Sequence, residues 1–136
     1  MNLDEMNKAV IAEFRANEGE TTGQFENVPL LLINTIGAKS GELRTKPLAY
    51  LRDGDRYVVF ASFAGAEKNP PWYHNLVANP EFELEVGAEK FTARATVAEE
   101  PERTELYSRM SDMMPVFAEY QEKTERVIPV LILERV

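Results

Sequence analysis

The feature that most constrains the fold of this 136-residue chain is a series of short strand-like segments separated by turns that contain glycine. Apolar residues dominate segment 28–36, and segment 44–52 alternates, with the glycine-flanked turn 37–41 between them. Residues 53–55 (Asp-Gly-Asp) are a hairpin signal that precedes another strand-like segment, 56–63. Turns this short join antiparallel neighbours, whereas parallel strands need long crossovers. The sequence therefore predicts antiparallel pairing.

Further strands and the helices complete the predicted pattern. Residues 82–86 and 91–97 alternate around Gly87 as a second hairpin, and 129–134 is a final apolar strand. The apolar spacing and the positions of proline predict helices over residues 3–16, 71–79, 99–114 and 117–126. About six mostly antiparallel strands with flanking helices define an α+β fold. We expect them to close into a small barrel, because closure removes exposed strand edges.

The length and the 44% hydrophobic content suit one core. We expect residues 1–24 to form an N-terminal helix and loop, parts of which lack fixed structure, and residues 25–136 to form the barrel domain. No run approaches the roughly 20 apolar residues of a membrane-spanning helix, and the N-terminal residues do not have the pattern of a secretory signal. We expect a cytoplasmic protein, with loose membrane association left open.

The charge and the residue types argue against several functions. A net charge of −8 does not suit nucleic-acid binding, which needs a basic surface. The chain has no cysteine and one histidine, His74, so we expect no disulfide, no cysteine nucleophile and no metal site. A serine hydrolase would need a Gly-x-Ser-x-Gly elbow, which the sequence does not contain.

Several of the few basic residues of this acidic chain gather around one turn. Lys39, Ser40, Arg44 and Lys46 lie in a strand–turn–strand unit whose turn begins at Gly37. Backbone N–H groups of a turn, cations and a hydroxyl are components of anion sites in proteins. The spacing is not that of a nucleotide P-loop, in which the turn enters a helix. A hairpin turn with solvated charges explains the same residues equally well.

A second group combines small side chains with aromatic ones. Residues 61–66 are small apart from Phe63, and residues 72–75 are Trp-Tyr-His-Asn. Small residues let a flat ring approach the backbone, and aromatic groups pack beside it. Structural roles are the alternative to ligand binding for these residues. Trp72 and Leu76 have the i, i+4 spacing of a helix face that packs on the core, and a lone histidine is more typical of the protein surface than of an active site.

A stripe of methionine and aromatic residues at helical spacing precedes and follows Pro115. Such a stripe is usually core packing, and we assign Met110 to the core. Methionine also suits adaptable apolar pockets. We therefore predict a pocket role for Met114, Phe117 and Tyr120, near the break at Pro115.

Four blocks of sequence resemble the deazaflavin-dependent nitroreductase and quinone reductase family. They are residues 30–50 (LLLINTIGAKSGELRTKPLAY), 54–59 (GDRYVV), 65–80 (GAEKNPPWYHNLVANP) and 126–130 (RVIPV). The similarity extends over about residues 25–135. It implies a split β-barrel related to flavin-binding oxidases, and a reductase that moves a hydride from reduced coenzyme F-420, a deazaflavin, to a small planar acceptor.

The resemblance also assigns residues to the coenzyme. Lys39, Ser40 and Arg44 would hold its phosphate, and residues 60–63 and 72–75 would flank its ring. The phosphate and the oligoglutamate tail are anionic, which gives the cationic turn a purpose in an acidic protein. The expected cofactor-binding residues are Ala38, Lys39, Ser40, Arg44, Thr45, Lys46, Pro47, Leu48, Ala49, Phe60, Ala61, Ser62, Phe63, Pro71, Trp72, Tyr73, His74, Asn75 and Phe117.

Departures from the family pattern bear on the acceptor. Relatives that reduce nitro compounds carry tyrosines where this chain has Met114 and Phe117, a lysine is common where it has Phe63, and some carry a larger residue where it has Ala49. We expect a quinone, enone or unsaturated lactone ahead of a nitroaromatic, with Tyr120 as the proton donor. An FMN-binding split-barrel oxidoreductase, a non-catalytic deazaflavin carrier and a homodimer stay open.

Overall fold

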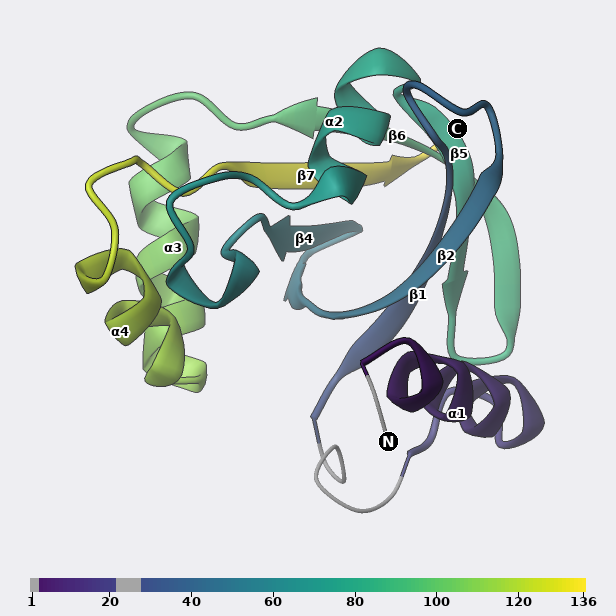
Figure 1. Cartoon of the computed structure of the whole chain (residues 1–136). Coiled ribbons are helices and arrows are strands. Elements are labelled where there is room, and N and C mark those ends of the chain that lie inside the picture. The colour runs from purple at the N-terminus through teal and green to yellow at the C-terminus, as the bar shows by residue number, and fades with distance from the viewer. Residues whose placement is uncertain (1–2, 22–27) are drawn as a thin grey trace.

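The computed structural model describes residues 3–21 and 28–136. Its strands form one curled antiparallel sheet in the order β2-β1-β5-β6-β7-β4-β3 (Figure 1). The strands are β1 (Leu30–Ile36), β2 (Leu43–Ala49), β3 (Leu51–Asp53), β4 (Arg56–Phe60), β5 (Glu81–Val86), β6 (Glu89–Val97) and β7 (Val130–Arg135). The helices are α1 (Leu3–Ala16), α2 (Pro71–Ala78), α3 (Glu102–Met113) and α4 (Val116–Glu122), with one 3-10 turn, η2 (Phe63–Gly65). Residues 1–2 and 22–27, which include parts of the predicted N-terminal segment, lie outside the described residues.

One bent segment serves both edges of this sheet. β2 pairs with β1 at one edge, and β3 pairs with β4 at the other. Only Tyr50 separates β2 from β3, and its N–H donates to the Pro29 carbonyl at 3.2 Å. We predicted about six strands, with residues 44–52 as one strand. The described residues form seven, because this segment bends at Tyr50, and the predicted α+β class of mostly antiparallel strands is confirmed.

The strand predicted over residues 56–63 is too long by three residues. β4 ends at Phe60, and η2 follows. Phe63, Ala64 and Gly65 all have positive φ angles, of 47°, 53° and 81°. A strand requires negative φ, so the chain must turn here. The turn carries Phe63 out of the sheet with 41% of its surface exposed.

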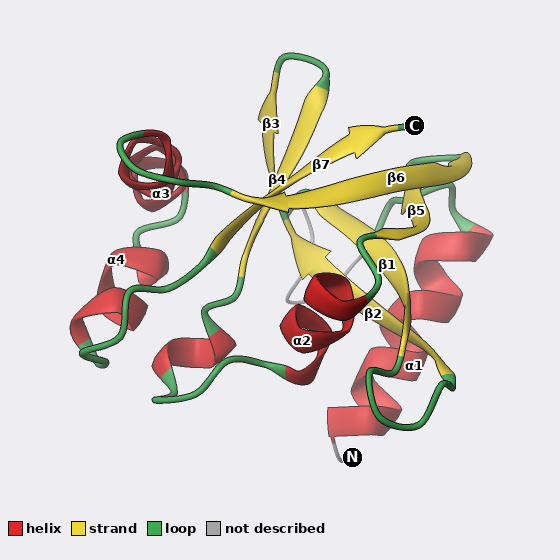
Figure 2. Cartoon of the chain, turned by 90° about the horizontal axis from the view of Figure 1, so that it is seen from above, coloured by secondary structure: helices red, strands yellow, loops and turns green. Residues whose placement is uncertain are grey.

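Two of the three apolar cores among the described residues lie on opposite faces of the sheet, and a third, smaller one packs α1 against β1. Alternate residues of β4 serve the first two: Tyr57 and Val59 join the core that α2 covers, and Val58 and Phe60 join the core under α3 and α4. Figure 2 shows α3 and α4 together at one end of the sheet and α1 at the other. Met110 is fully buried in the second core, which confirms its assignment. None of the helices in the described ranges is long and apolar enough to cross a bilayer.

A partly buried polar network ties α1 to the sheet. Arg15 donates two hydrogen bonds to the Glu85 carboxylate, at 3.1 and 2.8 Å. Asn34 donates to the same carboxylate at 2.9 Å and accepts from the Thr45 hydroxyl at 2.6 Å. The hydrogen bond from Arg15 lowers the pKa of Glu85, against the opposing effect of its burial. The network therefore links the helix to β1, β2 and β5.

Candidate functional site

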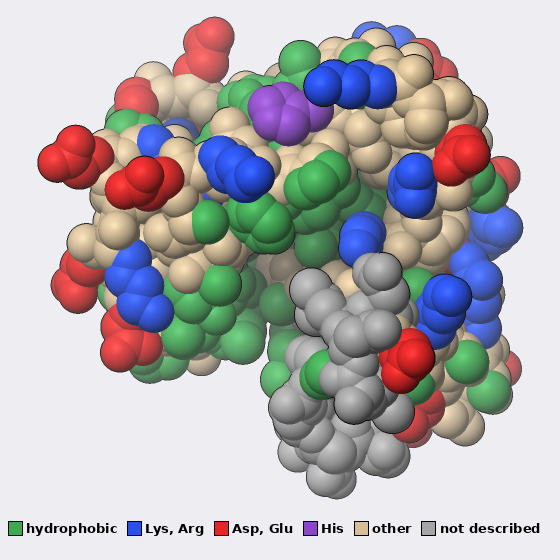
Figure 3. Space-filling model, in the orientation of Figure 1, with side chains coloured by type: hydrophobic (Ala, Val, Ile, Leu, Met, Phe, Trp, Pro, Cys, Tyr) green, Lys and Arg blue, Asp and Glu red, His purple; other side chains and the backbone are tan. Residues whose placement is uncertain are grey.

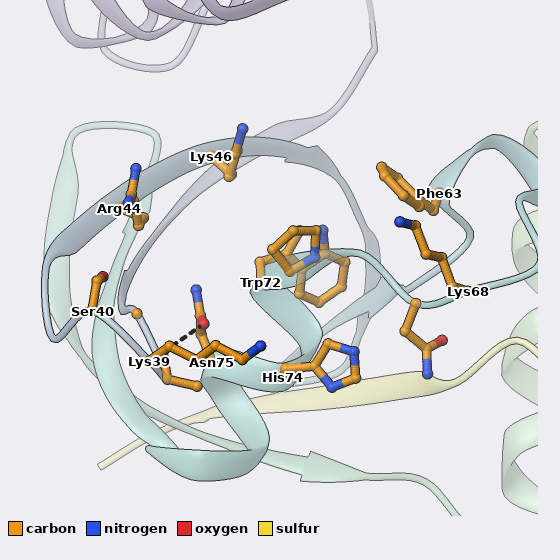
Figure 4. Close-up of a pocket in the computed structure, with 13 residues that line it drawn as sticks. Lys39, Ser40, Arg44, Lys46, Phe63, Lys68, Trp72, His74 and Asn75 are labelled. Carbon is orange, nitrogen blue, oxygen red and sulfur yellow. Dashed lines mark hydrogen bonds between the residues drawn. The ribbon is translucent and has the colours of Figure 1, made fainter.

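A cleft of about 690 Å³ opens between two walls that β3 and β4 separate in the sequence. Residues 37–46 form one, which we call the turn wall, and residues 61–69 form the other, the loop wall, with α2 between them. Figure 4 shows Lys39, Ser40 and Arg44 on one side, Phe63 and Lys68 on the other, and Trp72 between them. The lining residues are Gly37, Ala38, Lys39, Ser40, Arg44, Lys46, Phe63, Lys68, Asn69, Pro71, Trp72, His74 and Asn75.

The cleft is positively charged. Lys39, Arg44, Lys46 and Lys68 line it, whereas no aspartate or glutamate among the described residues does. Arg44 pairs with Glu42 at 3.1 Å, but both side chains are exposed, so the pair is weak. The three lysines form no ion pair with any carboxylate in the described ranges.

The positive cleft contrasts with the net charge of the whole chain, which is −8. On the face drawn in Figure 3, basic side chains and the histidine lie around the hollow, and acidic side chains lie mainly toward the edges. A concave site of one charge sign concentrates ligands of the opposite sign. The cleft is therefore suited to an anionic ligand.

The turn wall is shaped by bonds within the turn. The Gly37 N–H donates to the Glu42 carbonyl at 2.8 Å, and the Gly41 N–H donates to the Gly37 carbonyl at 2.9 Å. The Ser40 hydroxyl accepts from the Glu42 N–H at 3.2 Å. A Cβ at position 37 would lie 2.5 Å from the Ser40 oxygen, so a side chain there would displace the hydroxyl. Glycine at this position lets Ser40 fold back over the turn.

Asn75 connects the turn wall to α2. Its side-chain oxygen accepts the Ala38 N–H at 2.9 Å, and its side-chain nitrogen donates to the Thr35 hydroxyl at 3.1 Å. Both groups belong to the chain where β1 leads into the turn. We predicted Asn75 as a ligand-binding residue, and the structure gives it a second task, because it is buried and holds the turn in place.

The aromatic residues predicted for the site divide between cleft and core. Trp72 lines the cleft but is only 7% exposed and belongs to the first core, so its structural role is confirmed and its contact with the coenzyme stays a prediction. His74 is exposed at the cleft and lies edge to face with Tyr73 at 5.4 Å between ring centroids. Tyr73 itself packs against the first core and does not line the cleft.

The structure also adds cleft residues that the sequence analysis did not select. Lys68 and Asn69 line the loop wall. They fall inside a block that resembles the family, but a loop has no periodicity that would indicate where its side chains point. Among the residues that the structure describes, no three histidine or acidic side chains gather as a metal-ligand set.

Other predicted site residues support the walls without lining the cleft. Thr45 donates to Asn34 behind β2, and Leu48 packs against the first core. Phe60 belongs to the second core, and Ala61 belongs to the first. The remaining predicted cofactor residues outside the lining are Pro47, Ala49, Ser62, Tyr73 and Phe117. Their assignment to the coenzyme stays a prediction.

The predicted substrate pocket lies behind the loop wall. Met114, Phe117 and Tyr120 pack together in the second core and are not among the residues that line the cleft. The Tyr120 ring meets the Phe117 ring edge to face at 5.3 Å. α4 reaches the loop wall at Gly65, where a Cβ would lie 3.0 Å from the Tyr120 carbonyl oxygen.

A neighbouring tyrosine has a structural role. The Tyr107 hydroxyl donates to the Phe117 carbonyl at 2.6 Å, and burial raises the pKa of Tyr107 to about 12. This hydroxyl stays protonated at neutral pH, and its hydrogen is already donated to the backbone of α4. Tyr107 therefore fixes the position of Phe117, and Tyr120 remains the candidate proton donor of this group.

Comparison with known proteins identifies the family. Residues 6–135 match the family of F420H(2)-dependent quinone reductases. The F420H(2)-dependent quinone reductase Rv1261c of Mycobacterium tuberculosis (strain ATCC 25618 / H37Rv) is 41% identical over 110 residues, which cover 79% of this chain and 74% of that protein. The chain belongs to the F420H(2)-dependent quinone reductase family. The predicted class of enzyme, a reductase that depends on reduced coenzyme F-420, is confirmed at the level of this family.

Solved structures agree with the family assignment. The F420-H2 dependent reductase FDR-A is 38% identical, with a TM-score of 0.71 over 78% of this chain and 94% of its own. A protein described as a domain-swapped dimer is 34% identical, with a TM-score of 0.74 over 97% and 96% of the two chains. The heme storage protein HutZ of Vibrio cholerae, at 16% identity and a TM-score of 0.60 over 100% and 92%, shares the fold alone. The predicted split barrel is confirmed.

Proposed function

We propose that the cleft binds reduced coenzyme F-420 and that the protein transfers a hydride from it to a quinone or a related planar acceptor. The observation that carries this proposal is the set of four basic side chains that lines the cleft of an acidic chain, with no acidic side chain beside them among the residues that the structure describes. The quinone comes first because the family is described by that acceptor.

The dimensions and chemistry of the cleft fit the coenzyme. Its volume of about 690 Å³ lies within the roughly 300–1,000 Å³ of typical small-molecule sites. Lys39, Ser40 and Arg44 on the turn wall would hold the phosphate by charge-assisted hydrogen bonds. Phe63 and Trp72 would flank the planar ring, since both line the cleft away from the turn.

The side chains of this protein would orient and shield the reactants. When bound, a reduced deazaflavin supplies a hydride, because its ring favours two-electron transfer. Reduction of a quinone to a hydroquinone takes that hydride and one proton. The protein holds the two planar molecules at reacting distance and in register, which removes much of the entropic barrier. Trp72 and Phe63 would keep water from the ring.

The source of the proton and the range of acceptors form the finer part of the proposal. Tyr120 is half-buried behind the loop wall, and we propose that it donates the proton when the acceptor is bound. Solvent is the alternative donor. Conjugated enones and unsaturated lactones follow quinones as acceptors, because each accepts a hydride at a conjugated carbon. Nitroaromatics rank last, because Met114 and Phe117 provide no hydroxyl.

Two other functions use the same cleft. Lys39 and Arg44 would suit the phosphate of FMN as well as that of the deazaflavin. A carrier of the deazaflavin would bind it tightly without reducing any acceptor, and the lack of hydroxyls at Met114 and Phe117 favours this alternative. A homodimer is also proposed, supported by the neighbour described as a domain-swapped dimer. The cytoplasmic location stays a prediction.

The test is a fluorescence titration of the protein with coenzyme F-420 and, in parallel, with FMN. We expect saturable binding of the deazaflavin with a Kd in the micromolar range or below, and weaker binding of FMN. Oxidation of the reduced coenzyme is then followed by absorbance with a quinone, an enone and a nitroaromatic. Preference for FMN would reject the coenzyme assignment, and tight binding without turnover of any acceptor would indicate a carrier.

A further inference from the structure

Arg126 fastens the loop wall to the segment that leads into β7. Its guanidinium group donates four hydrogen bonds, and all four acceptors belong to residues 61–69. The acceptors are the carbonyls of Ala61 (3.1 Å), Ser62 (3.0 Å) and Ala66 (2.9 Å) and the side-chain oxygen of Asn69 (2.8 Å). A single side chain more than 55 residues away in sequence thus spans the loop wall from its start to its end.

The segment that Arg126 holds has an unfavourable backbone conformation. Ser62 is in the right-handed helical region, and Phe63, Ala64 and Gly65 follow with positive φ. Residues other than glycine in that region cost on the order of 1 kcal/mol or more each. The turn itself contributes only two backbone bonds, from Gly65 to Ser62 and from Ala66 to Phe63. The additional bonds from Arg126 stabilise a turn that the local sequence disfavours.

The surroundings of Arg126 indicate directional bonding rather than charge pairing. Arg126 forms no ion pair with any carboxylate in the described ranges, and burial lowers its pKa. The backbone of Arg126 is itself held in place. Gln121 donates to the Arg126 carbonyl at 2.7 Å, and the Arg126 N–H donates to the Thr124 hydroxyl at 3.3 Å. A half-buried guanidinium without a counter-ion is costly unless its N–H groups are satisfied, and here the loop wall satisfies them.

The same bonds leave donors free on the loop. The C=O and N–H of a trans peptide point in opposite directions. Arg126 donates to the carbonyls of Ala61 and Ser62. The N–H groups of Ser62 and Phe63 lie on the opposite sides of the same two peptide groups, so they point away from Arg126. No acceptor among the described residues takes the N–H of Ser62, Phe63 or Ala64. A right-handed residue followed by a left-handed one brings successive N–H groups together as a site for an oxygen acceptor or an anion.

We propose that Arg126 is a positioning residue for the coenzyme ring. It holds the loop wall so that Phe63 lies at the cleft and the N–H groups of Ser62 and Phe63 remain available to a carbonyl oxygen of a planar ligand. This inference rests on the proposed function of the cleft. It adds that the ring side of the cleft is held by a remote arginine, which does not itself line the cleft.

The experiment compares Arg126→Lys with Arg103→Lys. Arg103 is a matched control, because it is also half-buried and donates to the Ile128 carbonyl at 3.0 and 2.9 Å and to Gln121 at 2.6 Å, but it makes no bond to the loop wall. Two quantities are measured in each variant: the Kd for coenzyme F-420, and the hydrogen-exchange rates of the Gly65 and Ala66 amides without coenzyme. Melting temperature reports on overall stability.

We expect Arg126→Lys to raise the Kd at least tenfold and to speed both amide exchange rates at least tenfold, whereas Arg103→Lys changes each less than threefold at a similar melting temperature. Equal effects of the two substitutions, or no effect of Arg126→Lys, would overturn the proposal. If Arg126→Lys does not fold, Asn69→Leu removes one of the four bonds, and exchange at Ala66 must accelerate. If the unaltered protein binds no coenzyme, the proposed function fails, while the exchange rates still decide whether Arg126 holds the loop.

Discussion

The two walls of the cleft are built in different ways. The turn wall is held mainly by its own residues, since Gly37, Ser40, Gly41 and Glu42 bond to one another within six positions. The loop wall has few bonds of its own and is held by Arg126, about 60 residues downstream. A locally closed turn withstands changes elsewhere in the molecule, whereas a remotely held loop depends on the packing of the chain that holds it. The turn wall should therefore be the more robust of the two.

The largest effect is expected from removing charge from the turn wall. Lys39→Ala and Arg44→Ala should each weaken binding of coenzyme F-420 by about 1.5–3 kcal/mol, because each loses a charge-assisted hydrogen bond to the phosphate. The measurement is the Kd from fluorescence titration. Arg94→Ala is the control, since Arg94 is an exposed strand arginine paired with Glu81 outside the cleft. Wild-type affinity in both turn variants, with folding intact, would remove the proposed phosphate site.

A smaller effect is expected from breaking the connection between the turn wall and α2. Asn75→Ala leaves the Ala38 N–H and the Thr35 hydroxyl without their partner. Losing such bonds costs about 1–2 kcal/mol. Since the turn would loosen while its charges stay, coenzyme affinity should fall by roughly five- to thirtyfold. The measurement is the Kd of Asn75→Ala, compared with that of Asn75→Asp, because aspartate keeps acceptors for the Ala38 N–H and for the Thr35 hydroxyl. Identical affinity in Asn75→Ala would show that the turn holds itself.

Behind the loop wall, Tyr120→Phe should lower the rate of quinone reduction more than coenzyme affinity. The expected loss in kcat is about tenfold, less than the 10²–10⁴ of a dedicated general acid, because solvent also donates protons. Steady-state kinetics separate kcat from the KM for the coenzyme. Tyr107→Phe serves as comparison, since its hydroxyl bonds only the backbone of α4. An unchanged kcat in Tyr120→Phe would show that Tyr120 is not the proton donor.

The smallest effect concerns the pH dependence of the network that links α1 to the sheet through Glu85. The folded pKa of Glu85 is lowered from its ordinary value of 4.5, chiefly by Arg15. Its contribution to stability is therefore complete above that value and is lost as the pH falls through the folded pKa. As the pH is lowered from 7 to 3, the melting temperature of the unaltered protein should fall further than that of Glu85→Gln. Glu83→Gln, on the same strand and paired with Lys90 at 3.2 Å on the surface, should follow the unaltered protein. If the melting temperature of Glu85→Gln falls with pH as much as that of the unaltered protein, Glu85 is not the group responsible for the loss of stability.

The contrast between the walls also explains how much could be predicted from the sequence. Turns that contain glycine and alternating strands are local signals, so the hairpins, the α+β class and the cationic turn were predicted correctly. The seventh strand was missed because the two halves of the segment pair with different strands, β1 at one edge of the sheet and β4 at the other, and the local sequence does not show that the chain must bend at Tyr50 to do so. Asn69 was missed because its position depends on a hydrogen bond from Arg126, which no local pattern encodes. Lys68 was missed because it lies in a loop, where no periodicity indicates which way a side chain points.

The packing of aromatic residues was the other limit. Phe117 and Tyr120 have the same helical spacing whether they face a pocket or a core, and the structure places both in the second core. Trp72 belongs to the first core and also lines the cleft, so a choice between core and cleft could not describe its position. Periodicity identifies a buried face and leaves open what covers it.

The bent segment from β2 to β3 also determines how this barrel would respond to a cut. Arg44 and Lys46 lie on the half that pairs with β1, and the other half pairs with β4. A chain nicked or circularly permuted at Tyr50 would keep both pairings, but the two edges would no longer be covalently joined. The sheet would then be held closed at this point by noncovalent contacts alone. A ligand that contacts both the turn wall and the loop wall would therefore help to keep the two edges together.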